Sequence, residues 1–120
     1  IFYSKFMYLK KKLDNRLKKY FNYFSEKKID KLESLFSNDI QIIDWTANIK
    51  KKSKVLDFNK KLFKKFKSIN VKLDEKFYNQ RNKSFACKLT IKLDNKSINV
   101  VDLIYFDSKL QIKKIIAYLR

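Results

Sequence analysis

Residues 85–106 decide the fold, and they read FACKLTIKLDNKSINVVDLIYF. Apolar and polar side chains alternate from Phe85 to Leu93, which is the pattern of a β-strand with one buried face. Residues 94–97, DNKS, favour a turn, and a second apolar-rich run follows at 97–106. The segment therefore predicts two long antiparallel strands joined by a short turn.

Further strands are predicted on both sides of this hairpin. Residues 71–77 alternate in the same way and precede a turn at 79–82, while 107–109 turns the chain into a last strand at 110–119. A shorter strand, rich in β-branched residues, is expected at 40–44. Because the chain contains no glycine, we expect Asn and Asp to take the left-handed turn positions.

The first half of the chain instead follows the 3.6-residue period of amphipathic helices. Helices are predicted at 9–24 and 29–36, with 37–39 ending the second, and a third is expected to begin at Ser53 as its N-cap. The residues predicted to face the core are Leu9, Leu13, Leu17, Tyr20, Phe21, Phe24, Ile29, Leu32, Leu35, Phe36, Val55, Phe58, Leu62, Phe63 and Phe66.

Helices followed by an antiparallel meander are typical of the α+β class. We expect a cone-shaped fold in which three N-terminal helices pack on a curved, mostly antiparallel sheet that encloses a pocket. The 120 residues suffice for one domain, so a single domain over 1–120 is predicted, with 1–8 as an N-terminal extension. No run approaches the ~20 apolar residues of a membrane-spanning helix. With no export signal visible, we expect a cytoplasmic protein without a membrane partner.

The composition excludes several kinds of site. The absence of Gly removes the glycine-rich loops that bind phosphate, and the absence of His removes Ser-His-Asp catalysis and histidine metal ligands. Cys87 is the single cysteine, so neither an intrachain disulfide nor a thiolate cluster can form. We therefore expect no cofactor and no metal, and any catalysis must use carboxylates, Tyr, Lys, Ser or Thr.

The net charge of +18 suggests a polyanion partner at first sight. However, only Arg16, Arg81 and Arg120 are arginines among 30 basic residues, and phosphate recognition favours the arginine fork. We therefore favour solvated surface lysines over a nucleic-acid partner. A Lys-rich polyanion-binding module remains an alternative.

Two carboxylates interrupt apolar strand faces. Asp102 lies in the middle of the 97–106 strand in an otherwise apolar column, and Asp44 follows two isoleucines on one face of the 40–44 strand. An ionised carboxylate in apolar surroundings is costly unless it is paired, so each needs a raised pKa or a partner. The inward face of the first helix adds the hydroxyl of Tyr20.

Each of these residues also has a structural interpretation. Asp44 stands at a strand end, where an Asp often closes a turn. A bulge that rotates Asp102 outward, or a hydrogen bond from Asp102 to a helix end, would explain that residue without function. Tyr20 alone is more often a core aromatic than a catalytic acid.

Two stretches carry a resemblance to a known superfamily. Residues 35–44, LFSNDIQIID, resemble the L-F-x-x-D-x-x-x-x-D segment of the SnoaL-like, nuclear-transport-factor-two-like superfamily. Residues 101–107, VDLIYFD, followed by 112–118, IKKIIAY, are similar to its later strands. The match runs from about residue 13 to residue 120 and is closest to the ketosteroid-isomerase-like branch.

The resemblance implies an activity and its residues. In that branch a tyrosine of the first helix and a sheet aspartate form the oxyanion hole, and an aspartate ending the first strand is the base. It thus implies Tyr20 and Asp102 as oxyanion donors, and Asp44 as the base in proton transfer next to the carbonyl of a small apolar ligand. The residues expected to line the pocket are Leu17, Phe24, Ile42, Trp45, Phe58, Val100 and Ile104.

The chain departs from the family's pattern at two places. Pro is frequent after the base and Gly before the third helix, whereas this chain has Trp45 and, near the second place, Lys51. Trp45 is bulky enough to narrow the cavity or to recognise a flat ligand. A steroid substrate is therefore not implied.

The other face of the last strands is also rich in apolar residues. The residues predicted to form it are Asn99, Val101, Leu103, Tyr105, Ile115, Ala117 and Leu119. Such a patch suggests a protein interface, and the resemblance implies a homodimer through the sheet, with cover by the apolar N-terminus as the alternative. An isomerase or lyase, a non-catalytic ligand-binding or dimerisation domain of the same fold, and the polyanion-binding module are the functions that remain open.

Overall fold

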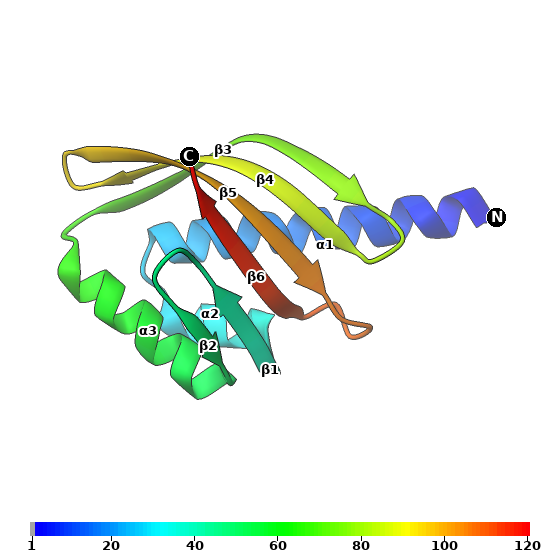
Figure 1. Cartoon of the computed structure of the whole chain (residues 1–120). Coiled ribbons are helices and arrows are strands. Elements are labelled where there is room, and N and C mark those ends of the chain that lie inside the picture. The colour runs from blue at the N-terminus through cyan, green and yellow to red at the C-terminus, as the bar shows by residue number, and fades with distance from the viewer. Residues whose placement is uncertain (1) are drawn as a thin grey trace.

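The computed structural model, which describes residues 2–120 with side chains from Lys5 onward, has three helices packed on a six-stranded sheet (Figure 1). The α+β class and the helix count are therefore confirmed, and the sheet is not closed. The helices are α1 (Phe2–Ser25), α2 (Ile29–Leu35) and α3 (Lys52–Lys65). The strands are β1 (Phe36–Ile43), β2 (Asn48–Lys50), β3 (Ile69–Asn79), β4 (Ser84–Leu93), β5 (Lys96–Phe106) and β6 (Ile112–Leu119).

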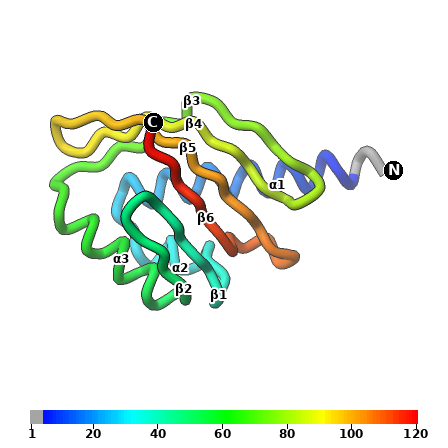
Figure 2. Tube along the Cα trace, viewed as in Figure 1, coloured from blue at the N-terminus to red at the C-terminus, as the bar shows by residue number. Residues whose placement is uncertain are grey.

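The sheet is mixed, with one parallel contact. Its strand order is β2-β1-β6-β5-β4-β3, and only β1 and β6 pair in parallel. These two strands are far apart in the sequence and run side by side (Figure 2). The prediction of a mostly antiparallel sheet is confirmed. The parallel contact brings Asp44, which follows β1, close to the C-terminal strand β6.

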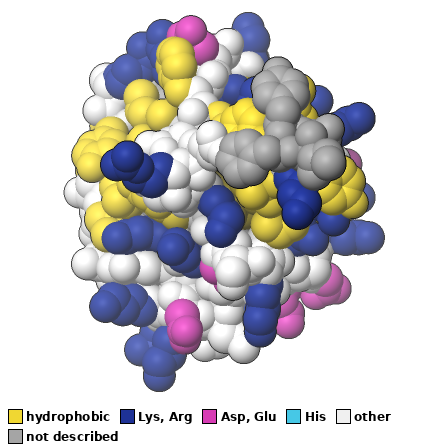
Figure 3. Space-filling model, turned by 90° about the vertical axis from the view of Figure 1, so that its right-hand side faces the viewer, with side chains coloured by type: hydrophobic (Ala, Val, Ile, Leu, Met, Phe, Trp, Pro, Cys, Tyr) yellow, Lys and Arg dark blue, Asp and Glu magenta, His cyan; other side chains and the backbone are white. Residues whose placement is uncertain are grey.

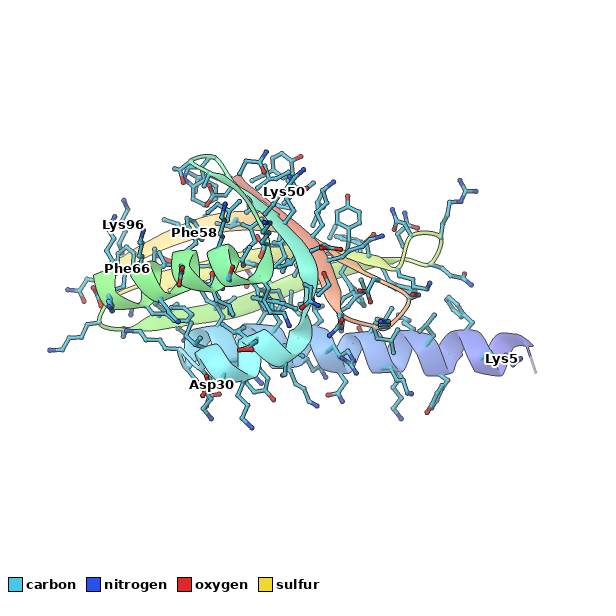
Figure 4. All side chains as sticks on the ribbon, turned by 90° about the horizontal axis from the view of Figure 1, so that it is seen from below. Lys5, Asp30, Lys50, Phe58, Phe66 and Lys96 are labelled. Carbon is cyan, nitrogen blue, oxygen red and sulfur yellow. The ribbon has the colours of Figure 1, made fainter. Side chains whose placement is uncertain are left out.

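The first helix is longer than predicted. It begins at Phe2, so residues 2–8, expected as an extension, continue α1 past the edge of the sheet, where Figure 4 labels Lys5. The ring of Phe6 lies 6.2 Å from that of Tyr78 on β3. Aromatic contact with the sheet therefore accompanies these additional residues of α1.

Two boundaries differ from the predictions because tertiary contacts outweigh local preference. Residues 37–39, expected to end the second helix, belong to β1, and the unpredicted strand β2 pairs with β1. Ser53 is not the N-cap of α3; Lys51 takes that position, with no side-chain hydrogen bond to the helix. The expected start of the third helix was therefore wrong by two residues.

The turns do not depend mainly on Asn and Asp. Positive φ angles occur at Lys27, Lys51, Lys83, Asp94 and Leu110, so among the described residues only Asp94 follows the prediction. The Nζ of Lys27 donates hydrogen bonds to the carbonyls of Phe66 and Lys67 after α3. The strands and helices on either side impose these conformations on residues that do not favour them.

The core lies between the helices and the inner face of the sheet. Its fully buried side chains include Leu13, Leu17, Leu32, Phe36, Ile40, Val55, Phe85, Ile104 and Ile112. No helix of the described chain is long and apolar enough to cross a membrane.

The face opposite the helices has a different composition from the one predicted. Register pairs Leu103 with Ile116 and Ala86, Ile116 with Ile43, and Ala86 with Phe77. These five residues form a continuous apolar row across five strands, named here the outer row. The assignment of Ile115, Ala117 and Leu119 to this face was wrong, because they pair with Ile104, Asp102 and Val100 of the inner face.

Candidate active site

One cross-strand row of the inner face carries the candidate residues. Register places Asp102 of β5 beside Ala117 of β6 on one side and Cys87 of β4 on the other. Because Ile43 pairs with Ile116, Asp44 continues this row next to Ala117. The two acids are therefore separated by one strand, β6, whose residue in this row, Ala117, has only a methyl side chain. The Cα atoms of Asp44 and Asp102 are about 10 Å apart.

Tyr20 approaches this row from α1. Its side chain is buried, and its ring lies 6.0 Å from Phe24 and 6.1 Å from Phe36. Burial raises the pKa of its hydroxyl well above 10.0, and the nearby negative charge of Asp102 raises it further. The hydroxyl therefore stays protonated and is available as a hydrogen-bond donor near Asp102.

Asp102 is the most perturbed acid of this row. It is only 8% exposed, and burial, followed by the charge of Asp44, raises the pKa of its carboxyl from 3.8 to about 7. The pairing of β5 with β4 is unbroken, so a bulge that rotates Asp102 outward is not present. A large fraction of Asp102 is protonated near pH 7 and can donate a hydrogen bond.

Asp44 has the structural role foreseen as its alternative. Its Oδ1 accepts hydrogen bonds from the Thr46 amide at 2.7 Å, the Thr46 hydroxyl at 2.9 Å and the Ala47 amide at 2.8 Å. These bonds close the turn after β1 and fix the carboxylate. The same carboxylate is near enough to Asp102 for its charge to raise that pKa, so it closes a turn and also faces the row.

Cys87 and Lys76 extend the row, although no sequence pattern predicted a site at either residue. Burial and the charge of Asp102 raise the pKa of the Cys87 thiol to about 12, against the opposing charge of Lys76. Lys76 Nζ donates a hydrogen bond to Asp14 Oδ1 of α1 at 2.8 Å. Strand alternation placed Cys87 inward, but only the register puts it opposite Asp102. A thiol with this pKa is a poor nucleophile.

The residues expected to line a pocket divide into three groups. Leu17, Ile42, Val100 and Ile104 are buried core residues. Phe24 and Phe58 are half-buried, and Figure 4 shows Phe58 in the middle of α3. Trp45 is 50% exposed in the turn that Asp44 closes, so its ring lies outside the core.

The described residues form surface hollows, two of which border the helices. One of about 410 Å³ lies between α1 and α2, and one of about 570 Å³ lies where α2, β1 and α3 meet. Neither is lined by Tyr20, Asp44 or Asp102. Within the described chain, no group of three His, Cys, Asp or Glu side chains is placed to hold a metal ion.

Comparison with known proteins identifies the fold. No protein-family model matches the sequence, and no curated protein does. A solved structure of the epoxide hydrolase/cyclase-like enzyme SalBIII, from pyran ring formation in salinomycin, superposes with a TM-score of 0.81 at 15% identity over 92% of each chain. The fold is SnoaL-like, or nuclear-transport-factor-two-like.

Two further solved structures agree. A candidate ketosteroid isomerase from Kribbella flavida superposes with a TM-score of 0.77 at 12% identity, over 92% of this chain and 78% of its own length. A candidate SnoaL-like polyketide cyclase from Shewanella denitrificans gives a TM-score of 0.74 at 12% identity over 90% of each chain. The predicted superfamily resemblance is thus confirmed at the level of the fold.

Proposed function

We propose that this SnoaL-like protein is an isomerase or lyase that removes a proton next to the carbonyl group of a small apolar substrate. The observation that supports this proposal most is the row of Asp44, Ala117 and Asp102 with Tyr20 beside it. It combines a carboxylate fixed in place with two neutral hydrogen-bond donors across a small side chain.

In the proposed reaction, Asp44 is the base. The oxygen of its carboxylate that does not close the turn accepts the proton, and the electrons of the broken C–H bond form a carbon–carbon double bond as the carbonyl oxygen becomes an enolate. Tyr20 and protonated Asp102 donate hydrogen bonds to that oxygen as its charge develops. Return of the proton to a different carbon completes an isomerisation.

The sheet offers apolar surface for the rest of the substrate. Towards the β4–β5 turn, register aligns Val71, Ile91 and Ile98 on the inner face, and each is only half-buried. Leu119, on the same face, is 49% exposed. We place the reacting carbonyl over Ala117 and the apolar body of the substrate along these residues.

The names of the structural neighbours agree with this chemistry. They include a cyclase-like enzyme, a candidate isomerase and a candidate cyclase. These names support an isomerase or cyclase type of role for this chain, and the assignment of each residue rests on the row described above.

Exchange of substrate protons into D2O, followed by NMR on a panel of cyclic ketones, tests the proposal without a known substrate. Asp44→Asn is expected to slow exchange at least ~100-fold because the base is lost. Asp107→Asn is the matched control, since Asp107 Oδ1 also closes a turn, accepting hydrogen bonds from Lys109 and Gln111. Equal rates in the two variants would remove Asp44 from the mechanism.

The oxyanion donors are tested in the same assay. Asp102→Ala and Tyr20→Phe are each expected to slow exchange by about 100- to 1,000-fold, as found when an oxyanion donor is removed. Asp102→Asn retains a neutral donor, so it is expected to keep most of the rate. If Asp102→Asn is as slow as Asp102→Ala, the charged form of Asp102 is required and the proposed role is wrong.

Non-catalytic ligand binding is the second candidate, and the turn closed by Asp44 favours it. Because Oδ1 already accepts three hydrogen bonds, a purely structural Asp44 would leave a binding site without a base. Binding of 4-nitrophenol, monitored by its absorbance, that depends on Tyr20 and Asp102 while no ketone exchanges protons would favour this candidate.

A polyanion-binding module has less support. Figure 3 shows Lys and Arg side chains scattered over the end of the molecule where α1 begins, among apolar side chains. They do not gather into one continuous patch on that face.

A further inference from the structure

The charged side chains that line the hollow between α1 and α2 are all basic. Lys12, Arg16 and Lys19 line it from successive turns of α1, together with Asn15, Tyr23 and Ser34. No Asp or Glu is among its lining residues. At about 410 Å³ it lies within the usual range for small-molecule sites, roughly 300–1,000 Å³.

The second hollow provides an internal comparison. It too has three lining lysines, Lys51, Lys52 and Lys60, but Glu33, Asp39 and Asp57 balance them. A chain with many surface lysines therefore does not give every hollow an unbalanced charge. Of these two hollows, only the α1–α2 hollow has an excess of positive charge.

The basic residues of this hollow have no acidic partner in the described chain. The ion pairs of the described chain join Lys28 to Glu26, Lys72 to Asp74, Lys76 to Asp14 and Lys88 to Glu75, and none of these residues lines the hollow. Lys12 Nζ instead lies 4.6 Å from the ring centroid of Tyr8. Like charges one turn apart destabilise a helix, and a bound anion would relieve that repulsion.

We propose that this hollow binds a small organic molecule that carries two phosphate groups. Arg16, which is central in the basic row, offers two parallel N–H donors that match a phosphate. Lys12 and Lys19 are about 10 Å apart along the helix axis, so they suit two separated anionic groups better than one. The Ser34 hydroxyl already donates to the Lys31 carbonyl at 2.6 Å, which leaves it free to accept from a ligand hydroxyl. This site is separate from the row of Asp44 and Asp102.

Isothermal titration with a hexose bisphosphate and with inorganic pyrophosphate tests the proposal. At ~0.15 M salt, where screening removes weak surface attraction, we expect a Kd below about 1 mM for the bisphosphate. The double variant Arg16→Gln with Lys19→Gln should weaken it by about tenfold or more. The control, Lys51→Gln with Lys60→Gln, removes the same charge from the balanced hollow and should change it less than about twofold. Circular dichroism of both variants checks that α1 and α3 are retained.

Three results would overturn the proposal. Equal weakening in the two double variants would mean that net charge alone attracts the ligand. Absence of binding by both probes would remove the site. Binding of short single-stranded DNA, with a salt slope steeper than about −3, in the absence of bisphosphate binding would assign α1 to polynucleotides instead.

Discussion

At the scale of single residues, Asp102 links the candidate site to stability. Its pKa is about 7 in the folded protein against 3.8 in the unfolded chain, so the folded state holds this proton more tightly. The stabilisation that comes from this tighter proton binding is fully present below pH 3.8. It is lost as pH rises from 3.8 through about 7, so the free energy of unfolding falls over that range. The full difference corresponds to about 4 kcal/mol.

Asp102→Asn is therefore expected to change the pH dependence of stability. Asparagine has the same shape and no charge, so the variant should gain roughly 2–3 kcal/mol relative to the natural chain between about pH 5 and pH 8. Urea unfolding at several pH values measures this difference. Asp107→Asn removes a carboxylate from a surface turn and should leave the curve parallel to that of the natural chain. Parallel curves for Asp102→Asn would contradict the buried, protonated state.

The candidate residues differ in how far sequence could predict them. Asp102 was found because strand alternation makes a mid-strand acid in an apolar column conspicuous. Asp44 was found by the same pattern, and its turn-closing role was foreseen as an alternative. Ala117 and Cys87 were not found, because their place beside Asp102 depends on pairing between strands that no local pattern encodes.

At the scale of elements, strand alternation and the helical period predicted the long strands and the helices. They did not predict the element boundaries that depend on contacts between strands. Residues 37–39 carry turn-forming side chains, yet they lie in β1. They connect Phe36 to Gln41, which pair with Ile112 and Lys114 of β6 on either side of a register shift. The predicted start of α3 was wrong for a related reason. Lys51 donates its backbone N–H to the Ile40 carbonyl, which ties the helix start to β1 rather than to a side-chain cap.

Lys51 also allows a prediction about the start of α3. Its backbone has φ 85° and ψ 137°, a region that non-glycine residues avoid. Lys51→Gly is expected to raise the free energy of unfolding by about 1 kcal/mol, because relief of strain exceeds the entropy cost of glycine.

Urea unfolding of the neighbouring variant provides the control. Lys50 lies in β2, where glycine weakens a strand, so Lys50→Gly should lower stability by about 0.5–1 kcal/mol. If both variants are destabilised alike, Lys51 is not strained by its conformation.

At the scale of the whole molecule, the fold class was predictable because helices precede an antiparallel meander, whereas the composition of each sheet face was not. The error over Ile115, Ala117 and Leu119 shows the reason. A shift of one residue in register moves every side chain of a strand to the other face, and the register of β6 is set by its contacts with β1 and β5.

The corrected outer row supports a proposal for assembly. Ile43, Ile116, Leu103 and Ala86 are half-buried and Phe77 is 56% exposed, while the helices pack on the opposite face. A row that crosses five strands provides a self-complementary strip for a two-fold contact. We therefore propose a homodimer through this face.

Leu103→Lys places a charge in the middle of the outer row and is expected to convert the proposed dimer to a monomer, because an unpaired charge at the centre of an interface is poorly tolerated. Sedimentation equilibrium measures the mass, and circular dichroism checks the fold. Met7→Lys is the control, since Met7 is 48% exposed on α1, away from the sheet face, and adds the same charge. A natural chain that sediments as a monomer, or a dimer that Leu103→Lys leaves intact, would exclude assembly through the outer row.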